Sequence, residues 1–205
     1  MEEGAAELDI RAEIQTRVDE IEQIIKRYLP EEEGYQKTIM EAMNYSILAG
    51  GKRLRPMLIL ETLRLFGGEE KLAYPFMAAM EMIHTHSLIH DDLPAMDNDE
   101  YRRGKKTTHA VYGEAMGILA GDALLNYAFE TAAKAFDMEP DNRNIGKAMQ
   151  ILATKAGIYG MVGGQVVDVQ SEDSGDITKE KLDFIYRLKT GALIESSMLI
   201  GAVLA

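Results

Sequence analysis

Five carboxylates and four permanent cations gather in one short segment of this 205-residue chain. Residues 90–100 read HDDLPAMDNDE, and RRGKK follows at 102–106. Aspartate oxygens suit Mg²⁺, which takes one or two protein carboxylates and completes its shell with water and phosphate oxygens. Arginines beside such a metal can bind phosphates in bidentate fashion. The segment therefore predicts a magnesium-assisted site for a phosphorylated ligand, and a solvated loop of mixed charge is the alternative.

The spacing of the aspartates requires a break in the helix that carries them. At 100° per residue, His84 and Asp91 lie on one stripe of an ideal helix, whereas Asp91 and Asp97 lie well apart. Pro94 removes an amide donor and disfavours helical geometry at the residue before it. We therefore expect the chain to leave the helix here and to return Asp97 beside Asp91.

A second basic segment, residues 50–56 (GGKRLRP), lies between two predicted helices. Its glycines allow a close approach of the backbone, and Lys52 and Arg55 can converge on an anion. The N-terminus of a following helix would add the positive end of its dipole. The segment alone is weak support for a second anion site, and it gains weight from the acidic segment.

Hydrophobic periodicity predicts helices along almost the whole chain. Apolar residues recur at three- and four-residue intervals between positions 8 and 28. Further helices are predicted over 36–49, from about 56 to the glycines at 67 and 68, over 72–92 and over 142–163. No sustained alternation indicates a sheet, and the longest irregular segment is 171–176. The prediction is one all-α domain, a helix bundle over residues 1–205.

Caps and glycines refine this pattern. Thr108 is a candidate cap for the next helical stretch, where Gly113, Gly117 and Gly121 repeat every four residues and would permit a close helix contact. Thr178 is a candidate cap for a helix that reaches position 189, and a last helix follows. Residues 198–205 (MLIGAVLA) are all apolar with no helix stop, so we expect further C-terminal sequence.

Composition excludes several classes of protein. The net charge of −12 argues against nucleic-acid binding, which needs a basic surface. The absence of cysteine excludes disulfides, thiolate metal sites and a cysteine nucleophile, and it is compatible with the cytoplasm. The N-terminus has no basic and apolar signal segment, and no apolar run is long enough to span a bilayer. We expect a cytoplasmic protein with a small anionic ligand.

The combined motifs resemble those of the trans-prenyl diphosphate synthases, especially the bacterial farnesyl diphosphate synthases and the related geranylgeranyl enzymes. They are GGKRLRP at 50–56, SLIHDDLPAMD at 87–97, RRG at 102–104, GGQ at 163–165 with Asp168, and KTGAL at 189–193. The resemblance implies a multi-helix bundle of the isoprenoid synthase type. The family's second aspartate-rich motif lies beyond the last of these segments and is absent here, so the expected bundle is C-terminally incomplete.

The resemblance also implies roles for individual residues. It implies Mg²⁺ binding by Asp91 and Asp97 with support from Asp92. The residues implied for the allylic diphosphate are Arg102, Lys189 and Thr190. Those implied for isopentenyl diphosphate are Lys52, Arg55, His84 and Arg103. Gln165 is expected beside the reacting carbons, which makes Lys189, Thr190 and Gln165 the catalytic candidates, and Asp168 is expected to orient a neighbouring cation.

The implied activity is Mg²⁺-dependent condensation of isopentenyl diphosphate with dimethylallyl or geranyl diphosphate by a homodimer. In this family the residue five places before the first aspartate helps to stop the growing chain. Here it is His86, followed by Ser87. Imidazole is flat but smaller than phenol, so we expect a fifteen-carbon farnesyl product, with the twenty-carbon geranylgeranyl product as the alternative.

Other interpretations of the same residues are weaker. His86 and His90 could chelate zinc, but no glutamate follows His86 as in metalloproteases. The Glu81-x-x-His84 pattern of di-iron bundles has no second copy. A His-Asp phosphohydrolase or a terpene cyclase would not need a second diphosphate site at Lys52 and the neighbouring basic residues. A non-catalytic subunit of a heteromeric synthase also stays open, because the second aspartate-rich motif is missing.

Overall fold

The computed structural model describes residues 9–172 and 177–205, and about three quarters of them are helical. The elements in chain order are α1 (Ile10–Lys26), α2 (Lys37–Ile47), α3 (Leu54–Leu65), α4 (Glu70–Asp91), β1 (Tyr101–Arg102), β2 (Lys105–Lys106), α5 (Thr108–Tyr112), α6 (Glu114–Ala133), α7 (Ala135–Met138), α8 (Arg143–Ala156), α9 (Met161–Glu172), α10 (Lys179–Ile185), the π-helical turn η1 (Tyr186–Thr190) and α11 (Gly191–Leu204). This confirms the predicted all-α multi-helix bundle.

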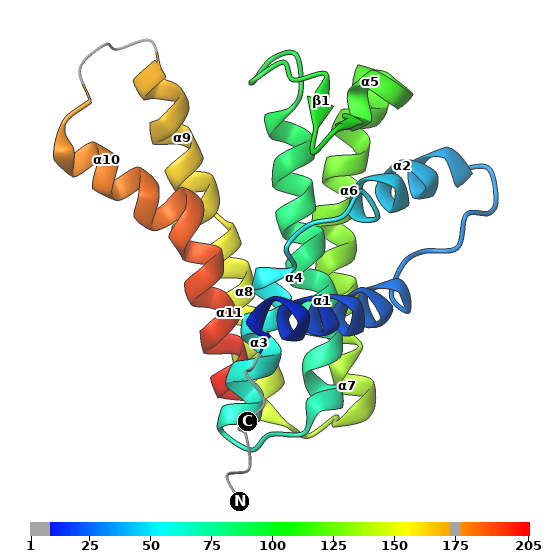
Figure 1. The fold of residues 1–205 in the computed structure, drawn as a ribbon, viewed down its shortest axis with the longest axis vertical. Coiled ribbons are helices and arrows are strands. Elements are labelled where there is room, and N and C mark those ends of the chain that lie inside the picture. The colour runs from blue at the N-terminus through cyan, green and yellow to red at the C-terminus, as the bar shows by residue number, and fades with distance from the viewer. Residues whose placement is uncertain (1–8, 173–176) are drawn as a thin grey trace, which may run out of the picture.

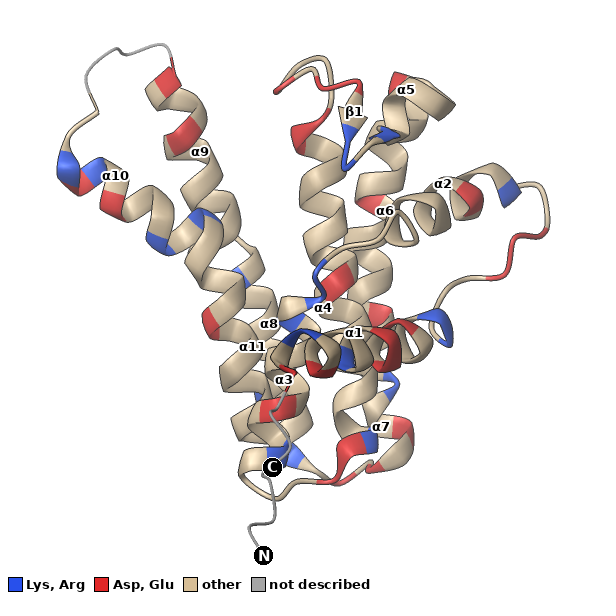
Figure 2. Cartoon of the chain, viewed as in Figure 1, with Lys and Arg blue, Asp and Glu red and all other residues tan. Residues whose placement is uncertain are grey.

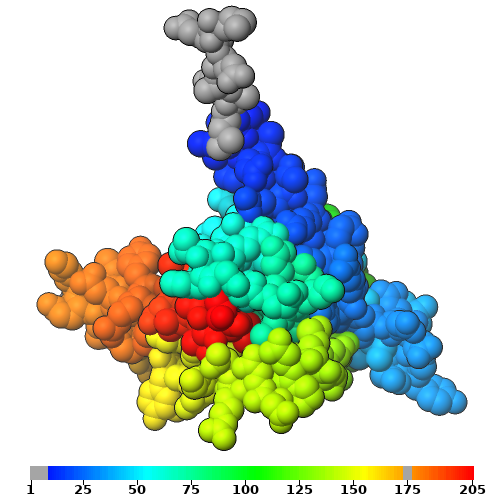
Figure 3. Space-filling view, turned by 90° about the horizontal axis from the view of Figure 1, so that it is seen from below, coloured from blue at the N-terminus to red at the C-terminus, as the bar shows by residue number. Residues whose placement is uncertain are grey.

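Helix α4 forms the centre of the bundle because apolar side chains surround it on most sides. Its buried residues include Phe76, Met77, Met80 and Ile83, as expected for a helix without a wide polar face. It packs chiefly against α6 and α3, while α11 packs against α3 and α8. Seen from below, α3, the end of α11 and the segment around α7 close the base (Figure 3).

The two sides of the bundle diverge at the opposite end. Helices α9 and α10 lean away from α4 and α6 (Figure 1), and a cavity lies between the C-terminal part of α4 and α9. Within the described residues, no helix has the length and apolar character needed to cross a membrane. Residues from several of the sequence motifs line the space between these two sides.

Two predicted helices are divided by glycines. The predicted helix 142–163 is wrong as one element, because α8 ends at Ala156 and α9 begins at Met161. Residues 157–160 form a turn after Gly157, the C-cap of α8, and a Cβ at Gly160 would lie 2.0 Å from the carbonyl oxygen of Lys155, so the turn requires glycine there. The stretch after position 108 breaks at Gly113, whose φ of +87° ends α5. Gly113 therefore separates α5 from α6 and does not mediate a helix contact.

The caps were predicted with mixed success. Thr178 accepts a hydrogen bond from the Lys181 amide at 3.3 Å and caps α10 as expected. Thr107 stands at the N-cap of α5, so the assignment of that cap to Thr108 is wrong by one residue. The predicted helix from Thr178 to position 189 changes into the π-helical turn after Ile185. Of the predicted irregular segment, residues 173–176 lie outside the described part of the chain.

A small antiparallel hairpin is the exception to the helical prediction. Strands β1 and β2 pair Tyr101 with Lys106 and Arg102 with Lys105. The turn residues Arg103 and Gly104 have φ of +53° and +76°, as the twist of a two-residue hairpin requires. Two-residue strands are too short to show alternating hydrophobicity, which explains why the pattern did not reveal them.

Candidate active site

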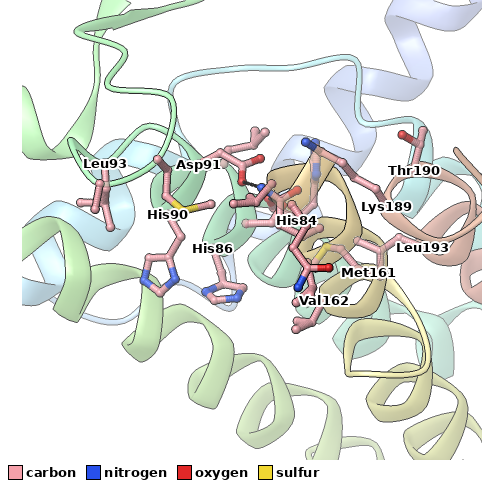
Figure 4. Close-up of a pocket in the computed structure, with 18 of the residues that line it drawn as sticks. His84, His86, His90, Asp91, Leu93, Met161, Val162, Lys189, Thr190 and Leu193 are labelled. Atoms are coloured by element: carbon pink, nitrogen blue, oxygen red, sulfur yellow. Dashed lines mark hydrogen bonds between the residues drawn. The ribbon is translucent and has the colours of Figure 1, made fainter. Parts of the chain in front are cut away.

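A cavity of about 690 Å³ opens between the C-terminal part of α4 and the facing α9 and η1 (Figure 4). Its walls are mostly apolar, and the polar residues that line it are Arg55, His84, His86, Ser87, His90, Asp91, Gln165, Gln170, Lys189 and Thr190. A mainly apolar cavity with a few convergent polar groups is the usual form of a small-molecule site. Eight residues that were predicted as site candidates from the sequence thus lie around one cavity, and His90 and Gln170 complete its polar lining.

The acidic turn folds as the position of Pro94 suggested. The Asp97 amide donates to the Asp91 carbonyl at 2.9 Å, and the Asn98 amide donates to the Leu93 carbonyl at 3.1 Å. These bonds return Asp97 to the end of α4 beside Asp91, and they confirm the predicted exit from the helix. Figure 2 shows this acidic turn close to the basic hairpin.

Asp91 links the two walls of the cavity. Its Oδ1 accepts a hydrogen bond from Gln165 Nε2 at 2.8 Å, although the two residues are 74 positions apart. Burial raises the pKa of Asp91 to about 6; the Lys189 ammonium opposes this shift, and the Asp97 carboxylate adds to it. A cation placed between the two aspartates would favour their charged forms.

The donor set fits Mg²⁺. In residues 9–172 and 177–205, no three carboxylate or imidazole groups converge to hold a metal by themselves. Asp91 and the exposed Asp97 offer two hard oxygen donors, which is the number that Mg²⁺ accepts when water and phosphate oxygens complete its shell. Such a site would need the diphosphate as well as the protein.

Asp92 points away from this cavity. Its buried Oδ1 accepts hydrogen bonds from Arg102, 2.6 Å from Nη2 and 2.8 Å from Nε. Both residues line a second, smaller cavity between α2, α4 and the hairpin. The structure thus places Asp92 in an ion pair with Arg102, and neither residue lines the large cavity; the support of Asp92 for the metal stays a prediction.

Lys189 enters the large cavity from η1 and is oriented by α9. Its ammonium forms an ion pair with Asp168, as the sequence suggested for that aspartate. Burial lowers the pKa of Lys189, but Asp168 and the more distant Asp91 outweigh burial and raise it. Gly164 lets α9 approach this turn closely, since a Cβ there would lie 2.2 Å from the Lys189 amide nitrogen. The lysine is thus a fixed cation opposite Asp91, as Figure 4 shows.

The residues predicted for isopentenyl diphosphate divide into two groups. Arg55 and His84 face the large cavity, with Arg55 Nη1 3.4 Å from His84 Nε2. Burial, reinforced by Arg55, lowers the pKa of His84 to about 3, so its imidazole is neutral. Lys52 is exposed and lines neither cavity, and Arg103 donates to the Gly50 carbonyl beside the smaller cavity. Of these four residues, only Arg55 and His84 line the large cavity, which Asp91 also lines.

Two imidazoles form the wall that faces α6. His86 Nδ1 lies 3.0 Å from the Gly121 carbonyl, and His90 Nε2 lies 3.1 Å from the Ile118 carbonyl. Their rings meet edge to face at 4.7 Å between centroids. Burial and the neighbouring His90 lower the pKa of His86 to about 4. This pair forms one wall of the cavity, and the absence of a third ligand gives the zinc interpretation no support in the described residues.

Sequence reasoning missed part of the lining. His90 was considered as a zinc ligand and in a His-Asp phosphohydrolase site, and the apolar residues Met161, Val162 and Val166 were not identified as cavity walls. Val162 and Val166 stand four positions apart in α9 on either side of the GGQ motif, a spacing that could have revealed a shared face. Ser87, in contrast, donates to the His84 carbonyl at 2.8 Å while it lines the cavity.

Known proteins are similar to this chain over most of its length. A geranylgeranyl diphosphate synthase of Cyanophora paradoxa is 49% identical over 189 residues, which are 92% of this chain and 62% of that protein. A farnesyl diphosphate synthase of Geobacillus stearothermophilus is 43% identical over 199 residues, 97% of this chain and 66% of that protein. This chain therefore spans less than two thirds of the length of either curated relative.

Solved structures give the same result for the fold. An FPP/GFPP synthase from Zymomonas mobilis superposes with a TM-score of 0.88 at 37% identity, over 95% of this chain and 70% of that chain. A geranyltransferase from Legionella pneumophila superposes with a TM-score of 0.88 at 33% identity, over 95% of this chain and 68% of that one. Residues 36–205 match the polyprenyl synthetase family, and the chain belongs to this family.

Proposed function

We propose that this chain is a Mg²⁺-dependent trans-prenyl diphosphate synthase that joins isopentenyl diphosphate to an allylic diphosphate. The observation that carries the proposal is the meeting of Asp91, Gln165 and Lys189 at the mouth of an apolar cavity. The carboxylate would recruit a cation, the ammonium would bind phosphate, and the apolar walls would hold the prenyl chain. A phosphohydrolase would not need such a dry cavity below its charged groups.

The residues divide the proposed reaction between them. Mg²⁺ held by Asp91 and Asp97 would neutralise the allylic diphosphate and so promote its departure. Lys189 and Thr190 bind the same leaving group from η1. Arg55 and neutral His84 bind the isopentenyl diphosphate, whose double bond attacks the allylic carbocation before a proton is lost.

Electrostatics and exclusion of water supply the rate enhancement. A pair of unit charges 4 Å apart is worth about 4 kcal/mol at an effective dielectric constant near 20, so a few such contacts remove much of an ionisation barrier. Met161, Val162 and Leu193 line the cavity and keep water from the carbocation. No protein nucleophile is required by this mechanism.

The proposed product is farnesyl diphosphate, and geranylgeranyl diphosphate is the alternative. His86 supports the shorter product because two ring contacts fix it: its Nδ1 meets the Gly121 carbonyl and its edge meets His90. A fixed imidazole is a firmer wall than a mobile one. The relatives leave both products open, since their names include farnesyl and geranylgeranyl synthases.

The assembly and the location of the protein are also proposals. We infer a cytoplasmic homodimer, as the resemblance to farnesyl synthases suggested. One relative that is 52% identical over 168 residues is named a heterodimeric geranylgeranyl pyrophosphate synthase large subunit, from Arabidopsis thaliana. That name favours a subunit of a heteromeric synthase as the second candidate function.

Product analysis tests the proposal directly. The chain is incubated with Mg²⁺, isopentenyl diphosphate and geranyl diphosphate, and the products are identified by mass spectrometry, with Asp91→Asn as the matched control. A product that requires both metal and Asp91 supports the synthase, and its carbon number decides the role of His86. Absence of product refutes catalysis by this chain alone, and recovery of product on mixing with a complete synthase would favour the subunit.

A further inference from the structure

We propose that Arg53 is a positioning residue that fixes the isopentenyl diphosphate site without touching the substrate. This inference rests on the proposed function, because it concerns the segment that contains Lys52 and Arg55. Arg53 stands between these two residues in the basic segment 50–56, yet it is 4% exposed whereas Lys52 is exposed. Three basic neighbours in sequence therefore have different surroundings.

The Arg53 guanidinium is held by groups from three parts of the fold. Its Nη1 donates to Glu81 Oε1 on α4 at 2.6 Å, and its Nη2 donates to the Ile47 carbonyl at the end of α2 at 2.7 Å. The same Nη2 lies 3.3 Å from Glu22 Oε1 on α1. Glu81 is itself 3% exposed, so this is a desolvated, hydrogen-bonded ion pair. Its contacts leave Arg53 no route to a ligand in the cavity.

The backbone of Arg53 turns the segment so that its neighbours point elsewhere. Arg53 has φ of +48° and ψ of +30°, a left-handed conformation that a residue with a Cβ adopts only when its surroundings enforce it. It occupies the N-cap position of α3, and Arg55 follows in the first turn of that helix. The buried ion pair thus stabilises the bend from which Arg55 enters the large cavity.

Glu81 connects this bend to the cavity through α4. His84 lies one helical turn after Glu81 and approaches Arg55 Nη1 at 3.4 Å. The Arg53–Glu81 pair and the Arg55–His84 pair are therefore two successive cross-links between the basic segment and one helix. Loss of the first is expected to shift the second, and a shift near 1 Å is enough to weaken binding of a precisely held ligand.

Binding measurements with each ligand alone test this inference. We expect Arg53→Gly, which keeps the left-handed backbone but removes the guanidinium, to raise the Kd of isopentenyl diphosphate at least about tenfold, with the Kd of geranyl diphosphate within about twofold. Arg53→Lys should restore part of the affinity. Equal losses for both ligands, or an unchanged isopentenyl diphosphate Kd, would overturn the inference.

Arg64 provides the matched control. It also joins three carboxylates, those of Glu20, Glu61 and Glu70, but it lines neither cavity. Arg64→Ala is expected to lower the unfolding midpoint while both dissociation constants stay within about twofold. If Arg64→Ala raises the isopentenyl diphosphate Kd as much as Arg53→Gly does, the effect of Arg53 is merely structural and the inference fails.

Two further variants separate the possible failures. Arg55→Gln tests the proposed site itself: an unchanged isopentenyl diphosphate Kd would refute the site and the inference together, whereas a raised Kd with no effect of Arg53 refutes the inference alone. If Arg53→Gly does not fold, Glu81→Gln keeps the shape of the partner. Amide hydrogen exchange at residues 50–55 should then accelerate relative to wild type, and unchanged exchange would contradict the positioning role.

Discussion

Replacing Gly164 by alanine is expected to push α9 away from η1 and to disable the cavity. The added Cβ would lie 2.2 Å from the Lys189 amide nitrogen and 2.8 Å from the Leu188 carbonyl carbon. Both are backbone atoms, so no side-chain rotation can relieve the overlap, and the two elements must separate by about 1 Å to restore an ordinary contact. The separation moves Lys189 and Thr190 relative to Asp91.

The magnitude follows from these distances. Overpacking of this kind costs about 1–3 kcal/mol of unfolding free energy. A displacement near 1 Å at a reacting centre lowers the rate by about 100-fold. The loss of kcat/KM in Gly164→Ala should therefore exceed the loss that partial unfolding alone would give at the assay temperature. Circular dichroism at that temperature measures the folded fraction, so the two effects can be separated.

Gly146 in α8 is the matched control for this variant. A Cβ at this exposed position meets nothing within 4 Å. Gly146→Ala should leave kcat/KM unchanged and raise the unfolding free energy by about 0.5–1 kcal/mol, since alanine favours the helix. If Gly164→Ala keeps both the activity and the unfolding midpoint of the wild type, the site does not require the close contact between α9 and η1, and the reasoning is refuted.

Three further predictions concern the cavity wall and its acid. Gly121→Ala would place a Cβ 2.1 Å from His90 Nε2, so the imidazole must leave the Ile118 carbonyl; a longer product by mass spectrometry is expected, and an unchanged product distribution argues against the wall. His86 has a pKa of about 4 in the folded protein, so as the pH drops below about 6.5 the unfolded chain binds the proton first and the free energy of unfolding decreases. His86→Phe should therefore lose about 2 kcal/mol less unfolding free energy than wild type between about pH 7 and pH 5, as measured by urea unfolding. An equal loss in both proteins would contradict this. Asp91→Asn should lower kcat at least about 100-fold and raise the unfolding free energy at neutral pH by about 1–2 kcal/mol. The gain in stability is expected because burial raises the pKa of Asp91 to about 6 and so penalises its charged form. A lower unfolding free energy in this variant would contradict that burial cost.

Local chemistry in the sequence predicted the features that depend on neighbouring residues. Pro94 indicated where the chain leaves α4, and the return of Asp97 to the Asp91 carbonyl followed from it. Thr178 was identified as a cap because its hydroxyl needs only the amide three residues later. These features are set by the backbone rules of a few consecutive residues.

Features that depend on distant partners could not be read in the same way. The orientation of Asp92 is set by Arg102 on a hairpin whose strands have only two residues. The burial of Arg53 depends on Glu81, which is 28 positions later in the chain. No periodic pattern in the sequence reports such pairings. The motifs did indicate residues that line the large cavity, such as Arg55, Asp91 and Lys189, but Lys52, Arg102 and Arg103 do not line it.

The π-helical turn joins α10 and α11 into one continuous helical rod and lets its two halves pack against different neighbours. Residues 186–190 act as one inserted residue between α10 and α11, which offsets their side-chain stripes by about 100°. The rod therefore faces α9 through η1 and then turns the stripe of Ala192, Ser196 and Ile200 toward α3 and α8. Deletion of one residue here would rotate α11 relative to α10 by about 100°. A correct contact of α10 and η1 with α9 would then exclude a correct contact of α11 with α3 and α8.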